Sequence, residues 1–207
     1  NPNQINQTET VDDSATNISN AAYQDRFGVE AQVMYEWTGD VAGKVWASGA
    51  TYDVTNNGTG ATLASGTDDS YTASAVDIGA SITTGNFGLT GYYYDGNGAG
   101  TTIFGQNGID RSAGKKRDSD GGYLQATYVI PTGTKLGLAY GVSNLDEASG
   151  ETLAAVVEKN ERWTVGAYHP LTKHLNLVAE YNRMESETHA KADYESDTFS
   201  LGAILFF

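Results

Sequence analysis

Hydrophobic and polar residues alternate along much of the chain with a period of two. The segment 26–37, RFGVEAQVMYEW, puts apolar and polar residues on opposite sides: Phe27, Val29, Ala31, Val33, Tyr35 and Trp37 against Arg26, Glu30, Gln32 and Glu36. An amphipathic helix needs apolar spacings of three and four, which would scatter Glu30 and Glu36 among the apolar positions. The alternation therefore predicts a β-strand.

Further segments show the same alternation: 44–54, 72–82, 87–94, 123–130, 135–143, 162–169, 175–182 and 197–207. The segment 162–169 is less decisive, because Trp163, Val165 and Ala167 compete with Tyr168 for the apolar side. In the segment 44–54 the pattern puts these residues on the apolar side: Trp46, Ala50, Tyr52 and Val54. Together the segments predict an all-β, antiparallel up-and-down protein with about nine strands of about nine to twelve residues.

The connections between these segments alternate in length. Short turns with turn-favouring residues are expected at 38–43, 83–86, 131–134 and 170–173. Long polar loops are expected at 55–70, 96–120, 144–161 and 185–196. One end of the sheet therefore carries tight turns and the other end carries the large loops, and the polar segment 1–25 is expected to be a further loop.

Two architectures fit such a meander. In a soluble sandwich or barrel the apolar face points inward, whereas in an outer-membrane barrel it meets lipid and the polar face lines a wet lumen. Strand length favours the membrane barrel, because globular strands average about five or six residues and a tilted strand needs about nine to eleven to cross hydrocarbon. Aromatic residues also gather near the apolar strand ends, as interfacial girdles do: Phe27, Trp37, Trp46, Phe87, Tyr93, Tyr128, Tyr140, Trp163, Tyr181, Phe199 and Phe207.

The composition removes several other classes of protein. The 207 residues include 26 acidic and 12 basic side chains and no cysteine, with a net charge of -14. The lack of cysteine excludes a disulfide framework and a thiolate metal site, and the negative charge speaks against nucleic acid as a partner. No run approaches the roughly 18 apolar residues of a membrane-spanning helix. A mean hydropathy of -0.40 fits a barrel whose polar face is wet.

The last segment, TFSLGAILFF (198–207), alternates apolar residues and stops on phenylalanine. It resembles the terminal strand of Gram-negative outer-membrane β-barrels, although an ordinary buried final strand would show the same alternation. Three internal segments resemble the C-terminal portion of the general-diffusion porins of Gram-negative bacteria: GVEAQVMYEWTGDVAGKVWASGATYD, DGGYLQATYVIPTGTKLGLAYG and WTVGAYHPLTKHLNLVAEYN. The resemblance covers roughly residues 26–207.

The resemblance implies a transmembrane β-barrel of roughly sixteen strands in the bacterial outer membrane. It implies a homotrimer in contact with lipid and lipopolysaccharide, acting as a water-filled channel for passive diffusion of ions and small hydrophilic solutes. It further implies that the last strand faces the membrane and is read by the barrel-assembly machinery, through Phe199, Leu201, Leu205 and Phe207.

The strand number has a consequence for domain organisation. Bacterial single-chain barrels have even numbers of strands, so about nine strands are expected to be the C-terminal part of the barrel. Residues 26–207 are then assigned to the eighth strand onward, and residues 1–25 to an extracellular loop. The N-terminal barrel half is expected outside this sequence, as a partner piece of a nicked barrel or as unrepresented chain.

Charged residues on the polar side of the strands are the candidate pore lining. They are Arg26, Glu30, Glu36, Lys44, Asp53, Asp77, Lys135 and Glu180. Asp77 and Glu180 lie in the middle of their strands, where facing lipid would cost about 2 kcal/mol or more. Their carboxylates therefore either bias ion selectivity or only wet the wall. In the family the constriction loop lies in the N-terminal half, so no constriction residue is assigned.

Other readings of the charged and titratable residues stay open. The basic loop residues Arg111, Lys115, Lys116 and Arg117 would contact lipopolysaccharide phosphates, fold over the channel mouth, or be solvated. A barrel enzyme would need a nucleophile and base gathered at one rim, and the histidines are spread: His169, His174 and His189. We therefore predict no catalytic residue, no cofactor and no metal. The alternatives to a channel are a structural or adhesin barrel and, less favoured, a barrel enzyme.

Overall fold

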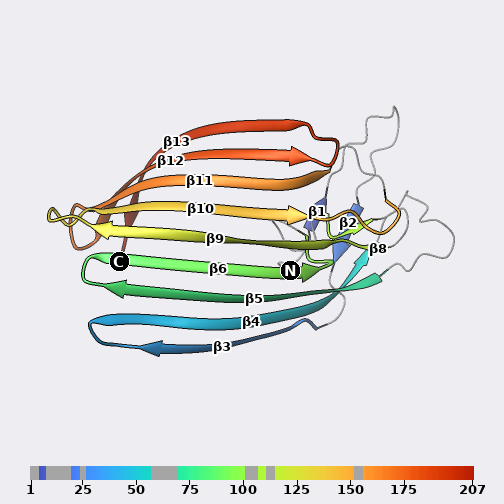
Figure 1. The fold of residues 1–207 in the computed structure, drawn as a ribbon, viewed down its shortest axis with the longest axis horizontal. Helices are drawn as coiled ribbons and strands as arrows, with labels where there is room; N and C mark the ends of the chain where they lie inside the picture. Colours follow the sequence, from blue (N-terminus) through green and yellow to red (C-terminus); the bar gives the residue numbers. More distant parts are fainter. Residues whose placement is uncertain are drawn as a thin grey trace.

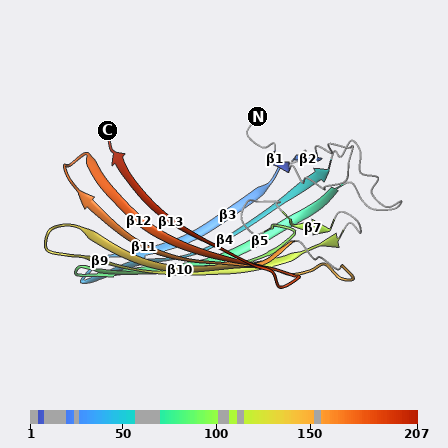
Figure 2. The same ribbon diagram turned by 90° about the horizontal axis from the view of Figure 1, so that it is seen from above.

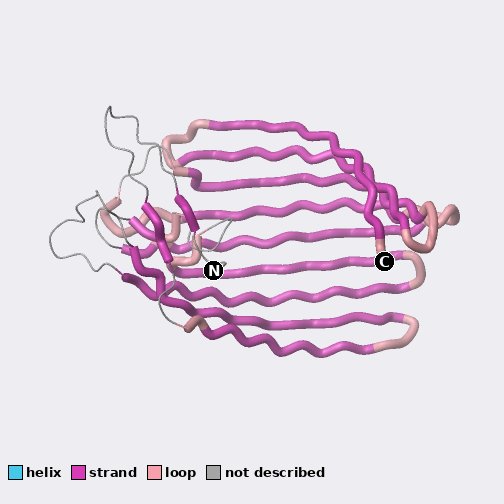
Figure 3. The backbone as a smooth tube through the Cα atoms, turned by 180° about the vertical axis from the view of Figure 1, so that it is seen from behind, coloured by secondary structure: helices cyan, strands magenta, loops and turns pink. Residues whose placement is uncertain are grey.

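The structure is a computed structural model that describes residues 5–7, 20–23, 27–56, 70–100, 107–110, 115–151 and 156–207. These residues form an antiparallel sheet without helices (Figures 1 and 3). The sheet curls into an open trough (Figure 2). No helix among the described residues is long and apolar enough to cross a membrane.

Long strands make up the sheet, and each pairs with the next long strand along the chain. They are β3 (Val29–Trp37), β4 (Val41–Asn56), β5 (Ser70–Thr84), β6 (Phe87–Asn97), β9 (Asp118–Val129), β10 (Lys135–Leu145), β11 (Val157–Pro170), β12 (Leu175–Thr188) and β13 (Asp193–Leu205). This order confirms the predicted meander of about nine strands.

Short strands lie at one end of the sheet (Figures 1 and 2): β1 (Ile5–Gln7), β2 (Asn20–Tyr23), β7 (Ile109–Asp110) and β8 (Lys115–Lys116). β7 and β8 pair with each other in a separate two-stranded sheet. β2 pairs with the last residues of β4, beyond the end of β3, and β1 pairs with β2. The segment 1–25 therefore adds two short strands to the sheet, and its extracellular position stays a prediction.

The two ends of the sheet differ as expected, with one exception. Tight turns follow β3, β5, β9 and β11 at the short-turn end, where Gly85 and Gly133 adopt φ of 53° and 83°. At the opposite, long-loop end the predicted loop 185–196 is wrong. β12 runs to Thr188 and β13 begins at Asp193. The charged residues there form rungs of the ladder, such as Glu185 opposite Glu195, so the missing apolar alternation hid the strands.

Directly paired residues share a face of the sheet, and the register separates an apolar face from a polar one. A single row on the apolar face runs across neighbouring strands: Tyr35, Val45, Ala80, Gly91, Leu124, Tyr140 and Trp163. The matching row on the polar face is Gln32, Ser48, Asp77, Tyr94, Gly121 and Ser143. The apolar side chains stay exposed, for example Val165 at 53%.

Burial excludes the soluble sandwich. The buried apolar residues among those described are Ala73, Ala99, Leu145 and Ala148, all at the long-loop end. A soluble sandwich would bury one whole face of these strands as its core. Here the hydrophobic face has no protein layer over it in the described structure, which is the arrangement expected when lipid covers it.

Trp46 corrects the sequence prediction for β4. Trp46 pairs with Met34 and Gly79, so it shares the polar face with Lys44 rather than the apolar side. A Cβ added to Gly79 would lie 2.0 Å from Trp46 Cζ2, because the indole ring packs over this glycine. The same parity puts Ala50 and Tyr52 on the polar face. Because Trp46 is a large aromatic residue on the polar face of β4, its parity looks in the sequence like that of an apolar face.

The glycine under Trp46 gives a packing test. We expect Gly79→Ala to displace the indole ring and to lower stability by about 1–3 kcal/mol, measured as a lower midpoint of thermal unfolding. Gly202→Ala is the matched control, because a Cβ there meets nothing within 4 Å. Equal midpoints for the two variants would contradict the packing of Trp46 over Gly79.

Candidate functional site

The polar face gathers most of the predicted lining residues. The register places six of them there: Glu30, Glu36, Lys44, Asp77, Lys135 and Glu180. Arg26 lies outside the described residues. Whether this face lines a pore stays a prediction at this point.

Asp53 lies on the other face. It pairs with Thr72 and has the same parity along β4 as Val45, and Thr72 Oγ1 donates a hydrogen bond of 2.6 Å to its Oδ1. The predicted face of Asp53 is therefore wrong. It lies near the long-loop end of the strand, past the apolar row, where both faces are polar and a charge carries no information about the side.

Two carboxylates on the polar face are held by hydrogen bonds. Gln32 Nε2 donates to Ser48 Oγ, and Ser48 Oγ donates to Asp77 Oδ1, both over 3.0 Å. On the same face, several strands away, Tyr168 donates its hydroxyl to Glu180 Oε1 over 2.5 Å. These bonds fix the carboxylates in orientation on the wall.

The polar face also holds a basic group that the sequence analysis did not assign. Arg162 donates through Nη2 to Asn182 Oδ1 over 2.6 Å, and Thr164 Oγ1 donates to the same atom over 2.7 Å. The sequence holds evidence for the face of Arg162, because Arg162, Thr164 and Gly166 alternate with Trp163, Val165 and Ala167. Tyr168 has the same parity as Arg162, however, so alternation alone does not decide which side of this strand is polar.

Aromatic rings form a second feature of the polar face, and the alternation in 87–94 had placed Tyr92 and Tyr94 opposite the apolar residues Phe87, Leu89 and Tyr93. Tyr92 lies between Tyr94 and Tyr123, with ring centroids 6.3 Å and 5.6 Å away. Lys44 Nζ lies 5.5 Å from the centroid of Trp46. The wall therefore offers flat ring faces beside its charges.

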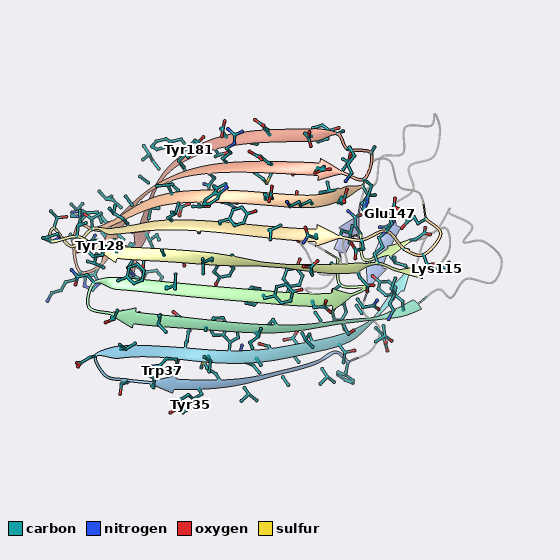
Figure 4. All side chains as sticks on the ribbon, viewed as in Figure 1. Tyr35, Trp37, Lys115, Tyr128, Glu147 and Tyr181 are labelled. Carbon is teal, nitrogen blue, oxygen red and sulfur yellow. The ribbon has the colours of Figure 1, made fainter. Side chains whose placement is uncertain are left out.

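Aromatic residues on the apolar face form two belts. The first, called the long-loop belt, lies near the middle of its strands and contains Tyr93, Tyr140, Trp163 and Tyr181. The second, called the short-turn belt, lies nearer the short turns on its own strands and contains Tyr35, Trp37, Phe87 and Tyr128. Figure 4 shows Tyr35, Trp37 and Tyr128 toward the short-turn end, with Lys115 and Glu147 at the opposite end. The spacing of belts that flank an apolar band is typical of strands that cross a membrane.

The long-loop belt does not follow the hydrogen-bond rows. The row through Tyr93 leads over four strand steps to Glu185 on β12, whereas the belt residue on β12 is Tyr181, four positions nearer the short turns. With strands about 4.8 Å apart and residues about 3.4 Å apart, the belt crosses the rows at about 35°.

The short-turn belt slants in the same direction. The row through Trp37 passes Leu89 on β6 and Ala126 on β9, and the belt residues on these strands, Phe87 and Tyr128, lie two positions nearer the short turns. The same spacings give about 20–25°. Strands of outer-membrane barrels tilt by about 35–45°, so the long-loop belt is level when the strands have that tilt.

The tyrosines of the long-loop belt all point their hydroxyls away from the apolar band. Tyr93 donates to Asp120 over 3.4 Å and Tyr181 donates to Asp197 over 2.8 Å. Tyr140 donates to Glu161 in the same way. Each carboxylate lies nearer the long-loop end than its tyrosine. A ring in lipid with its hydroxyl on a hydrated carboxylate marks the edge of the hydrocarbon.

An enclosed ion pair joins two connections at the long-loop end. Arg117 Nε and Nη2 donate to Glu151 Oε2 and Oε1 over 2.9 Å and 2.6 Å, with side-chain exposures of 7% and 5%. Arg117 Nη1 donates to the carbonyl of Asn107, and the backbone N–H of Ala148 donates to Glu151. These bidentate bonds lower the pKa of the Glu151 carboxyl.

The rest of the basic loop cluster has related contacts. Lys115 Nζ donates to the carbonyl of Ser149, and Lys116 Nζ donates to the carbonyl of Thr72. Arg111 lies outside the described residues. At the positions that the structure describes, the cluster ties connections to one another, and contact with lipopolysaccharide stays an open prediction.

The histidines do not converge. His169 Nδ1 lies 3.0 Å from Thr134 Oγ1 and His174 Nδ1 lies 3.1 Å from the Phe206 carbonyl, both at the short-turn end. His189 lies at the opposite end, with Nδ1 4.0 Å from carboxylate oxygens of Glu147 and Glu158. No group of side chains suited to holding a metal ion occurs among the described residues.

Comparison with known proteins decides the family. The family model for Gram-negative porins matches residues 3–189. The chain belongs to the Gram-negative porin family. Its location is therefore the bacterial outer membrane. In this porin we expect the apolar face to be the lipid face and its belts to be the interfacial girdles.

A solved structure supports the same fold. The chain is similar to the crystal structure of the outer membrane channel DcaP of Acinetobacter baumannii, with a TM-score of 0.74 and 18% identity. The match covers 93% of this chain and 55% of that chain, so this porin chain spans about half the length of the channel. No curated protein matches the chain.

Neighbouring residues on β10 test the lipid face. We expect Leu138→Arg to cost about 2 kcal/mol or more of folding free energy in a bilayer, because the charge would face hydrocarbon. Ala139→Arg places the same charge on the polar face and is expected to cost much less. The measurement is denaturant unfolding of the full-length porin in lipid vesicles. A larger loss for Ala139→Arg would reverse the assignment of faces.

The Arg117–Glu151 pair gives a pH-dependent prediction. Because the pKa of Glu151 is lowered in the folded porin, its stabilising contribution is present above the usual value of about 4.5 and is lost as the pH falls through the lowered pKa. The protection factors against hydrogen exchange at the amides of Gly98 and Arg117, whose bonds depend on this packing, are expected to fall on acidification.

Glu151→Gln is expected to raise exchange at those amides about ten-fold at neutral pH, because it leaves Arg117 enclosed without its counter-charge. Glu147→Gln is the matched control, since Glu147 lies in the same connection and is 39% exposed. If both variants exchange like the unchanged porin, the ion pair does not hold these connections together.

Proposed function

We propose that this porin chain forms part of the wall of a water-filled channel for passive diffusion of ions and small hydrophilic solutes. The observation that carries the proposal is the two-faced sheet, with a girdled apolar face and a polar face bearing Asp77, Glu180, Lys44 and Arg162. A sheet of this kind separates lipid from water without any reacting group. The family and the similarity to an outer membrane channel support it.

The sheet edges support a larger barrel. In the described structure β3 pairs only with β4, and β13 pairs only with β12. Unpaired backbone N–H and C=O groups are too costly in hydrocarbon to leave open. We infer that further strands, about seven in a barrel of roughly sixteen, pair with both edges and close the channel.

The remaining expectations about surroundings are part of this proposal. The exposed row of β13 on the apolar face, which includes Phe199, Leu201 and Leu205, is expected to meet lipid or a neighbouring barrel. Phe207 follows it at the short-turn end, where we expect the assembly machinery to bind. Above the girdle, lipopolysaccharide is the expected neighbour, and a homotrimer is the expected assembly.

Planar-bilayer recording on the full-length porin tests the channel. We expect discrete conductance steps in potassium chloride. Asp77→Asn combined with Glu180→Gln is expected to lower the permeability ratio of potassium to chloride about two-fold or more, because it removes two fixed carboxylates from the wall. The measurement is the reversal potential in a salt gradient.

Glu195→Gln is the control, because Glu195 is an exposed carboxylate on the apolar-face side of the long-loop rim. An absence of discrete channels would overturn the channel in favour of a structural or adhesin barrel. If the permeability ratio of the double variant equals that of the unchanged porin, Asp77 and Glu180 do not contribute to ion selectivity.

A further inference from the structure

A cleft lies on the polar face where the wall meets the connection after β6. Its volume is about 610 Å³. The wall contributes Glu30 and Gln32 from β3, Ser48 from β4 and Asp77 from β5, and β6 contributes Tyr92 and Tyr94. Ala99 and Gly100 close it from the connection. The cleft is therefore a recess in the channel wall.

The lining has a definite chemistry. Two carboxylates, Glu30 and Asp77, come from different strands, and the lining includes no lysine, arginine or histidine. Ser48 orients the Asp77 carboxylate, and the tyrosines Tyr92 and Tyr94 line the same cleft. Carboxylates and ring faces both attract cations, and a ring face also favours a flat or apolar body.

The cover of the cleft is held in place. The buried Ser119 hydroxyl donates to the Gly100 carbonyl over 2.9 Å, and the Gly98 amide donates to the Arg117 carbonyl over 2.9 Å. Gly98 and Gly100 adopt φ of 74° and 75°, which other residues rarely reach. The enclosed Arg117–Glu151 pair anchors this connection in turn. A preformed recess costs a ligand little reorganisation.

We propose that this cleft is a binding subsite for small organic cations, namely amines or guanidinium compounds with a flat or apolar body. Such a solute pauses there during passage, with its charged group at Asp77 and Glu30 and its body against Tyr92. The inference rests on the proposed channel function, because the solute reaches the cleft from the lumen.

Benzylamine is a suitable probe, with benzoate as its anionic counterpart. In bilayer recordings on the full-length porin, benzylammonium is expected to reduce the potassium chloride current in a concentration-dependent way, and benzoate is expected to be at least about five-fold less effective. Asp77→Asn keeps the shape of the side chain and is expected to raise the half-blocking concentration of benzylammonium about five-fold or more.

Two further variants separate the subsite from general wall charge. Glu180→Gln removes a mid-strand carboxylate from the far part of the same face and is expected to change the half-blocking concentration less than about two-fold. Tyr92→Leu retains both carboxylates and is expected to weaken block by benzylammonium more than block by methylammonium, which has no ring.

The outcomes separate this inference from the channel itself. Unchanged block in Asp77→Asn, or an equal loss in Glu180→Gln, would overturn the subsite while the conductance steps still establish a channel. Equal block by benzylammonium and benzoate would overturn it as well. A porin without conductance steps contradicts the proposed function. The subsite is then tested separately by equilibrium binding of benzylamine to the detergent-solubilised porin, which Asp77→Asn is expected to weaken.

Discussion

The backbone hydrogen-bond ladder is the constraint on which the rest of this porin depends. In hydrocarbon no water satisfies a free N–H or C=O group, so every crossing segment must pair with a neighbour on both sides. The described strands meet this requirement from β4 to β12 by pairing each long strand with the next. The period-two alternation follows from the ladder, because a paired strand has only two faces to divide between lipid and water.

This constraint explains why the described part of the chain buries so few apolar side chains. Those that are buried cluster at the long-loop end, with Leu145 the largest of them. Between the two belts the apolar side chains are exposed in the described structure, as expected where lipid is the neighbour. Folding of the wall is then expected to depend on backbone pairing and on transfer of the apolar face into the bilayer. The angle of about 35° found from the long-loop belt links side-chain chemistry to barrel geometry.

The sequence predicted the fold where lipid imposes the pattern and failed where it does not. The nine long strands were recognisable because leucine, valine and aromatic residues recur on one face. The ends of β12 and β13 were missed, since above the girdle both faces meet water and residues such as Glu185 and Glu195 carry no alternation. Asp53 was assigned to the wrong face for the same reason. Trp46 failed differently, because a wall that faces water still accepts an aromatic ring over a glycine.

The candidate site combines both cases. The face of Asp77 was predictable, because a carboxylate in the middle of a strand is too costly to place against lipid. The cleft that Asp77 lines was not predictable, because alternation places Tyr92 and Tyr94 on the side opposite Tyr93 but does not show that they meet Asp77 and the connection after β6. The cover comes from a connection whose fold depends on Arg117, a residue that looks like one of several solvated charges in the sequence. The enclosed pair with Glu151 lies outside the lipid band, where the ladder places no demand on side chains. The pattern of the wall is thus the one that a membrane requires, whereas the cover of its recess is tied to loop contacts such as the bond from Gly98 to Arg117 and the ion pair of Arg117 with Glu151.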